Sequence, residues 1–113
     1  KSIGNYGELK AANHLISSGF KIIKKNFYTR FGELDIIAQK GQSLHIIEVK
    51  FLTSAYIHSG YKINRKKRIR MIRCTQLFID QYNIKNAYIQ FDLIMLNHNQ
   101  IKHLKNIFNL SDV

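Results

Sequence analysis

The stretch Phe31–Phe51, with the sequence FGELDIIAQKGQSLHIIEVKF, constrains the fold more than any other part of the chain. It contains two short, mostly apolar runs, Leu34–Ala38 and Leu44–Phe51, on either side of the turn-forming residues Lys40–Ser43. Apolar runs of this length bounded by turn formers are typical of a β-hairpin. Because the runs are largely apolar on both faces, we expect the hairpin to lie in a sheet that is covered on both sides.

Four charged residues meet across this predicted hairpin. If the turn is centred on its Gly-Gln pair, Asp35 faces Glu48 and Glu33 faces Lys50. Directly opposed carboxylates, about 5 Å apart, repel by ~3 kcal/mol at an effective dielectric constant of about 20. A shared proton, the ammonium of Lys50 or a bound divalent cation would each offset this repulsion. Glu48 and Lys50 are two residues apart on one strand and therefore point to the same face.

The charge balance indicates a polyanionic partner. Eighteen Lys and Arg against seven Asp and Glu give the chain a formal net charge of +11. A nucleic acid is the natural partner for such a chain. The alternatives are a basic protein that is merely soluble and one that contacts anionic lipid.

Chain length and cysteine content limit the number of domains and the cellular compartment. A chain of 113 residues predicts a single domain over residues 1–113. The one cysteine, Cys74, excludes an internal disulfide and a cysteine-based zinc site, which suits a reducing compartment. No apolar run approaches the roughly 20 residues needed to span a bilayer, so we expect a cytoplasmic protein without a membrane partner.

Hydrophobic periodicity predicts a mixture of helices and strands. The predicted elements are a helix at Tyr6–Ser18, a strand at Phe20–Tyr28, the hairpin, a loop at Leu52–Asn64, a helix at about Lys62–Tyr82, and strands at Lys85–Leu96 and Ile101–Phe108. The first three strands form an antiparallel meander, and the helical crossover lets the next strand run parallel to one of them. The predicted fold class is therefore α/β of the mixed α+β kind, with a central mixed sheet flanked by helices on both faces.

Two carboxylates outside the hairpin have structural explanations. Glu8 falls in the first turn of the first predicted helix, where the helix dipole favours a negative charge. Asp92 lies inside the apolar run of the predicted strand Lys85–Leu96. We expect Asp92 to be a strand-end or hydrogen-bonding residue rather than a catalytic one.

The second predicted helix carries a basic stripe. At 100° per residue, Lys66, Arg70 and Arg73 share one side, and Lys62 extends the stripe if the helix begins early. Six of the nine residues from 65 to 73 are cationic and none is acidic. Like charges at this spacing destabilise a helix, so a bound polyanion explains the stripe better than a solvated face does.

Most of the chain resembles a known family. The segments that carry the resemblance, between Gly4 and Phe108, are GELKAANHLISSGF, KKNFYTRFGELDIIAQ, LHIIEVKF, RKKRIR, FDLIML and KHLKNIF. They resemble the YraN-type family of uncharacterised proteins, which is placed among the PD-(D/E)XK nuclease-like folds, close to Holliday-junction resolvases. GELDIIA followed by IIEVK is far more specific than an isolated ExK. The resemblance implies a restriction-endonuclease-like core with the element order αβββαβ.

The resemblance also implies roles for individual residues. Asp35 and Glu48 would bind Mg²⁺ or Mn²⁺, with the backbone carbonyl of Val49 as a further oxygen ligand. Lys50 would orient or activate the attacking water and stabilise charge on the phosphate. Glu8 would reach the site from the first helix.

The chain departs from the family pattern at several places. Leu34 stands where the superfamily's name has proline, and Phe51 and Leu52 follow the lysine where many relatives have Thr and Arg. The glutamine often found on the following helix is replaced by Lys67 or a neighbour. A phosphate contact is therefore expected to be missing after the lysine.

These expectations lead to two hypotheses. The first is a metal-dependent endonuclease that hydrolyses phosphodiester bonds in DNA, with branched DNA and a homodimer as arrangements that the resemblance to resolvases allows. Glu33 is then the ion-pair partner of Lys50 or a secondary ligand, and Arg30 joins the basic stripe in facing the nucleic acid. The second is a catalytically weak nucleic-acid-binding or partner-docking module that keeps the nuclease fold.

Overall fold

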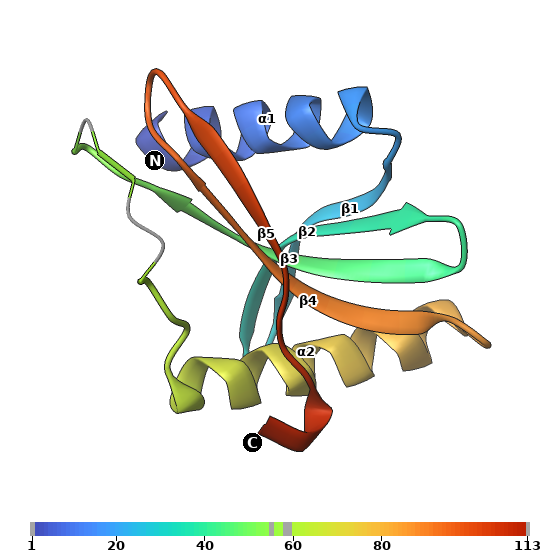
Figure 1. The fold of residues 1–113 in the computed structure, drawn as a ribbon. Coiled ribbons are helices and arrows are strands. Elements are labelled where there is room, and N and C mark those ends of the chain that lie inside the picture. The colour runs from blue at the N-terminus through green and yellow to red at the C-terminus, as the bar shows by residue number, and fades with distance from the viewer. Residues whose placement is uncertain (1, 55, 58–59, 113) are drawn as a thin grey trace.

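The computed structural model describes residues 2–54, 56–57 and 60–112 and shows one sheet between two helices (Figure 1). The elements are α1 (Ser2–Ser17), β1 (Lys21–Thr29), β2 (Gly32–Lys40), β3 (Ser43–Phe51), α2 (Arg65–Tyr82), β4 (Tyr88–Leu96), β5 (Ile101–Phe108) and the short 3₁₀ helix η1 (Leu110–Asp112). This succession confirms the predicted order αβββαβ and the additional last strand. Within the described residues, no helix combines the length and apolar character needed to cross a membrane.

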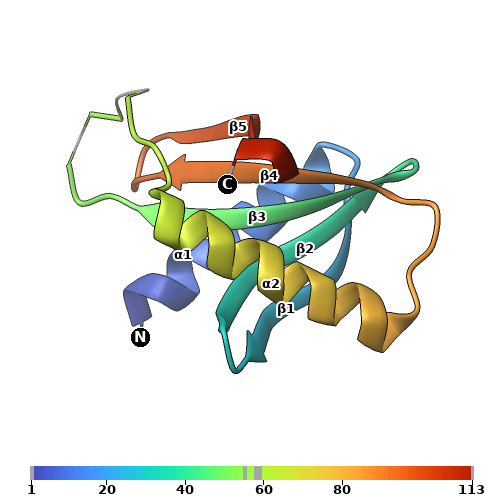
Figure 2. The ribbon, with the colours of Figure 1, turned by 90° about the horizontal axis from the view of Figure 1, so that it is seen from below.

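The sheet has five strands in the order β1-β2-β3-β4-β5. The pairs β1–β2, β2–β3 and β4–β5 are antiparallel, whereas β3 and β4 are parallel. The parallel pair is possible because α2 carries the chain back along one face of the sheet, as Figure 2 shows. The predicted fold class, a mixed sheet with a helix on each face, is confirmed and is consistent with a restriction-endonuclease-like core.

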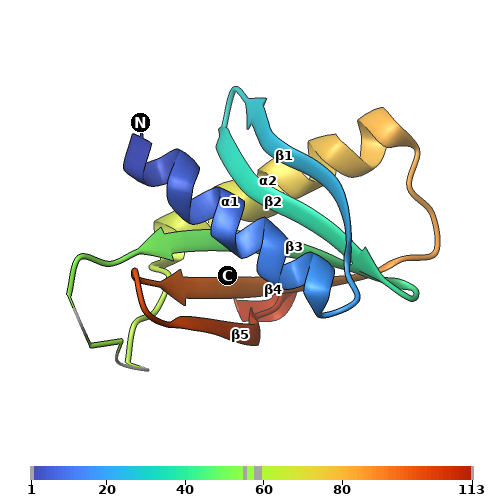
Figure 3. The same cartoon turned by 90° about the horizontal axis from the view of Figure 1, so that it is seen from above.

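The β2–β3 hairpin has the predicted register over part of its length. Residues Ile36–Lys40 of β2 pair with Ser43–Ile47 of β3 as the centred turn requires. Beyond this stretch β2 remains paired with β1, and the two strands turn away from β3 (Figure 3). The ladder therefore ends at Ile36 and Ile47. Both predicted pairs, Asp35 with Glu48 and Glu33 with Lys50, lie beyond it, so the prediction that they are directly opposed partners in the ladder is wrong. The strands separate at the charged residues.

Apolar side chains form a packed layer on each face of the sheet. Ile46 of β3 and Phe78 of α2, both fully buried, belong to one layer. Ile47 of β3 and Leu15 of α1 belong to the other. Successive residues of β3 thus serve opposite layers, which confirms the alternation expected for a strand covered on both sides.

Both helices begin at residues other than those predicted. Since α1 begins at Ser2, Glu8 lies beyond its first turn, and the helix dipole does not explain this carboxylate. α2 begins at Arg65, after the N-cap Asn64, whose side-chain oxygen accepts a backbone N–H of the first turn at 2.9 Å. Lys62 precedes the helix, so it does not extend the basic stripe along α2.

Candidate metal and nucleic-acid site

Three carboxylates from two elements meet where β2 leaves β3. One oxygen each of Glu8, Glu33 and Asp35 lies within 4.8 Å of the other two. Glu8 projects from α1, and the other two residues belong to β2. The Glu8 side chain therefore reaches the hairpin carboxylates from outside the hairpin.

The ionisation of Asp35 is strongly perturbed. Its Oδ2 accepts the backbone N–H of Val49 at 2.9 Å, at the point where the β2–β3 ladder has ended. Burial and the negative charge of Glu48 raise the pKa of Asp35 to about 7. Glu8 and Glu33 add to this rise, whereas the Val49 hydrogen bond lowers the pKa. A bound cation would relieve the same repulsion that now favours the protonated acid.

Glu48 lies on the neighbouring strand and has a cationic partner. Its side chain is buried, and its Oε2 forms an ion pair with the Nζ of Lys67 from α2. Burial lowers the pKa of Lys67, but the hydrogen bond and the charge of Glu48 outweigh burial, so the pKa is raised. The ammonium that offsets the charge of Glu48 thus comes from Lys67 rather than from Lys50.

The next two residues of β3 are placed differently. Val49 is half-buried and gives its N–H to Asp35; its carbonyl as a metal ligand remains a prediction. Lys50 is exposed, and its Nζ lies 5.7 Å from the centre of the Tyr61 ring. Pairing of Lys50 with Met95 of β4 keeps this end of β3 extended.

Asn26 of β1 is a residue of this site that the sequence did not reveal. Its Nδ2 donates to Glu8 Oε1 at 2.7 Å and to Glu33 Oε2 at 2.9 Å. The signal in the sequence is weak: a residue with low strand propensity occupies the middle of a predicted strand. The role of Asn26 becomes visible only in the folded protein, where α1 packs near β1 and brings Glu8 within hydrogen-bonding distance of Asn26.

The side chains at this site fit a divalent cation. The side-chain atoms that could bind the cation are carboxylate oxygens, the hard ligands that Mg²⁺ and Mn²⁺ prefer. Burial is the main cause of the raised pKa of Asp35, and the charge of Glu48 adds to it even though Lys67 forms an ion pair with Glu48. A pocket of about 240 Å³, with Asp35, Glu48 and Arg70 in its walls, adjoins these carboxylates.

Cationic side chains gather beside the carboxylates. The guanidinium groups of Arg30 and Arg73 lie against the ring of Phe31, at 4.7 and 5.4 Å from its centre. Arg70 lines the pocket itself. Arg70 therefore lies at the site itself, whereas Arg30 and Arg73 lie at Phe31, the residue that precedes Gly32 of the pocket wall. All the predicted nucleic-acid contacts are exposed: Arg30, Lys62, Lys66, Arg70 and Arg73.

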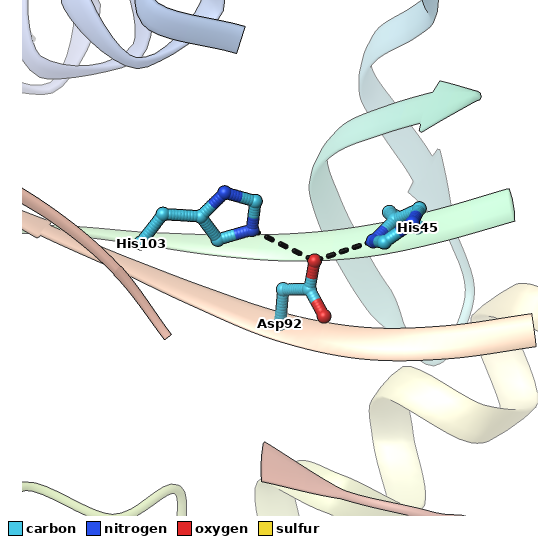
Figure 4. A group of neighbouring side chains, drawn as sticks. All are labelled: His45, Asp92 and His103. Carbon is cyan, nitrogen blue, oxygen red and sulfur yellow. Dashed lines mark hydrogen bonds and ion pairs between the residues drawn. The ribbon is translucent and has the colours of Figure 1, made fainter. Parts of the chain in front are cut away.

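A second buried polar group joins three strands on the α1 side of the sheet (Figure 4). Asp92 Oδ2 is bonded to His45 Nδ1 at 2.6 Å and His103 Nε2 at 2.8 Å. Its Oδ1 accepts the Asn106 N–H at 2.9 Å. Burial alone would raise the pKa of Asp92, but these hydrogen bonds lower it to about 2. Three hydrogen-bond partners satisfy the buried carboxylate, which confirms the predicted hydrogen-bonding role of Asp92.

Comparison with known proteins identifies the family to which the chain belongs. A family model described as "Uncharacterised protein family UPF0102" matches residues 7–96. A UPF0102 protein of Persephonella marina is 38% identical over 95% of this chain and 93% of its own length. UPF0102 proteins of Campylobacter fetus and Campylobacter jejuni are 36% and 40% identical, each over 92% of this chain and 91% of the relative. The chain therefore belongs to the uncharacterised protein family UPF0102, the YraN family.

Proposed function

We propose that this protein is a metal-dependent endonuclease that hydrolyses phosphodiester bonds in DNA, with branched DNA as the first substrate to test. The observation that carries the proposal is the cluster of Glu8, Glu33 and Asp35, with Glu48 beside Asp35 in a pocket that α2 helps to line. Clustered, partly buried carboxylates are unfavourable unless they bind a counter-ion, and such perturbed groups concentrate at functional sites. The site therefore has a physical reason to bind a cation.

The proposed mechanism gives each of these residues one role. Asp35 and Glu48 would hold Mg²⁺ or Mn²⁺, with Glu8 and the carbonyl of Val49 as further oxygen donors. Such an ion, when bound, would supply Lewis-acid chemistry, which polarises a phosphate and lowers the pKa of a water. The N–H of Val49 holds Asp35 in place. Lys50, on the same strand face as Glu48, would orient the attacking water and stabilise the charge that develops on the phosphate.

The basic residues would hold the nucleic-acid backbone. Arg70 lines the same pocket as Asp35 and Glu48, so a phosphate bound by Arg70 would lie next to the carboxylates. Arg30 and Arg73 are held against the Phe31 ring, which orders their guanidinium groups before DNA arrives. Contacts to phosphate position a substrate without reading its sequence, so we propose binding that depends on shape and charge.

The test is cleavage of defined DNA. Purified protein is incubated with Mg²⁺ or Mn²⁺ and linear, flapped or four-way DNA. We expect metal-dependent cutting of at least one substrate, and its loss in Glu48→Ala. The control variant Lys102→Ala removes an exposed lysine of β5 and should cut normally. Absence of cutting on every substrate, or cutting that survives Glu48→Ala, would contradict the proposal.

The ion pair between Lys67 and Glu48 favours a second candidate, a catalytically weak DNA-binding module. In that case the ammonium of Lys67 takes the place of the metal ion beside Glu48, one of the two main proposed ligands. This candidate predicts salt-sensitive DNA binding that survives loss of both Asp35 and Glu48. Calorimetric titration of Mn²⁺ into the wild type and Asp35→Ala separates the two, because only the endonuclease binds the ion through Asp35.

A further inference from the structure

Asn26 engages two carboxylates of the proposed metal site at once. Its Nδ2 lies 2.7 Å from Glu8 Oε1 and 2.9 Å from Glu33 Oε2. An amide NH₂ group has two hydrogens, so both are used on carboxylates. One side chain of β1 thus connects α1 to β2 at the site.

The backbone of Asn26 is unusual for its place in the fold. Its φ is 54°, in the left-handed region, although it lies inside β1. On either side, Lys25 and Phe27 keep their pairing with β2. A left-handed residue other than glycine costs roughly 1 kcal/mol or more, and asparagine tolerates it best. Such conformations persist where the surroundings require them, and they cluster at functional sites.

The chemistry of the asparagine side chain suits a cation site. A Lys or Arg at this position would neutralise Glu8 and Glu33 and compete with a metal ion. An Asp would add a further negative charge and could not donate a hydrogen bond when ionised. The neutral amide restrains both carboxylates and leaves their charge available.

We propose that Asn26 is a positioning residue that holds Glu8 and Glu33 in place for a divalent cation. This inference rests on the proposed function, because it assigns the carboxylates to a metal site. It adds a residue of β1 to that site and explains how Glu8, which is on another element, is kept near Asp35. Partners that orient metal ligands typically contribute 10- to 100-fold to metal affinity.

The experiment compares Mn²⁺ affinity by calorimetry in matched variants. Asn26→Gly removes the amide and keeps the left-handed backbone accessible. The control is Asn86→Gly, since Asn86 is exposed and has a φ of 61°. We expect Asn26→Gly to weaken Mn²⁺ binding by about tenfold or more, and the control to leave it unchanged. In a Glu8→Ala/Glu33→Ala background, Asn26→Gly should have no further effect.

The outcomes separate this inference from the proposed function. If the wild type binds Mn²⁺ and Asn26→Gly binds it equally well, the positioning role is overturned and the metal site stands. The positioning role is also overturned if the variant only lowers the thermal midpoint in chelator, or if its effect persists without Glu8 and Glu33. If the wild type binds no Mn²⁺, both proposals fail.

Discussion

The ionised carboxylate that the proposed function requires at Asp35 destabilises the metal-free protein. Burial and the charge of Glu48 oppose its ionisation, so its pKa lies at about 7 instead of the usual 3.8. The N–H of Val49 lowers this pKa. A residue retained for structure alone would be better uncharged here, since a neutral side chain could accept the same hydrogen bond.

Asp35→Asn is therefore expected to stabilise the metal-free protein, by roughly 1–3 kcal/mol at pH 8. Because the folded pKa is the higher one, the contribution of the acid to stability is full below pH 3.8 and is lost as the pH rises through about 7. Asparagine keeps an oxygen for the Val49 N–H and has no charge to lose. Urea unfolding in chelator at pH 8 and pH 5 measures the effect, which should be larger at pH 8.

Asp80→Asn is a suitable control, because Asp80 is an exposed carboxylate on α2. It should change the free energy of unfolding little at either pH. A loss of stability in Asp35→Asn of equal size at pH 8 and pH 5 would show that ionised Asp35 is well accommodated without a metal. The explanation of its raised pKa would then be wrong.

At the scale of elements, the buried group around Asp92 links β3, β4 and β5. His45 comes from β3 and His103 from β5, and both are bonded to one oxygen of Asp92 on β4. The β4–β5 register shifts between Phe91 and Leu93, which flank Asp92. The parallel pair and the edge strand are thus connected by side chains as well as by backbone hydrogen bonds.

Asp92→Asn is expected to destabilise the protein by roughly 2 kcal/mol at pH 7. The folded pKa of about 2 is below the usual 3.8, so the ionised carboxylate stabilises the fold above about pH 4. This contribution is lost as the pH falls toward 2. Urea unfolding of both proteins at pH 7 and pH 3 measures it, and the difference should shrink at pH 3. A difference that is the same at both values would mean that the charge of Asp92 does not matter.

The elements themselves could be predicted because their signals are local. Alternation in β3 identified both buried faces, and the Lys40–Ser43 turn determined the hairpin register. The end of that register was not predictable, since β2 leaves β3 while it stays paired with β1. The start of α1 was also missed because residues 2–5 have no apolar periodicity.

The candidate site could be predicted only where its residues share the hairpin. Asp35 and Glu48 were identified from opposed strands, and Glu8 from the family resemblance. The partners of these carboxylates come from elsewhere: Lys67 from α2 and Asn26 from a left-handed position in β1. Contacts of this kind depend on how the helices pack on the sheet, and no periodicity in the sequence encodes them.

The cationic surface of the molecule lies directly beside its acidic site, since Arg70 lines the same pocket as Asp35 and Glu48. The chain has a net charge of +11, and α2 begins with four consecutive cations. One of them, Lys67, turns inward to Glu48, whereas Lys66, Arg70 and Arg73 remain exposed. We therefore expect DNA affinity to depend on where the positive charge lies as well as on its total.

Two triple variants of equal net charge test that dependence. Changing Lys66, Arg70 and Arg73 to Gln lowers the net charge from +11 to +8, because three positive charges are removed. Changing Lys21, Lys85 and Lys102 to Gln, all exposed on other segments, has the same effect on net charge. If total charge alone attracts DNA, the two variants lose the same affinity. If α2 contacts phosphates, the first variant loses far more.

Fluorescence anisotropy with linear and four-way DNA, in chelator and between about 50 and 200 mM salt, distinguishes these cases. Each phosphate contact contributes about −0.9 to the slope of log affinity against log salt. We expect the α2 variant to flatten that slope by about 3 and the control variant to change it little, because only the first set would lie along the bound backbone. Equal slopes in the two variants would place the DNA on a surface other than α2, and the proposed path of the substrate past Arg70 to the carboxylates would then be wrong.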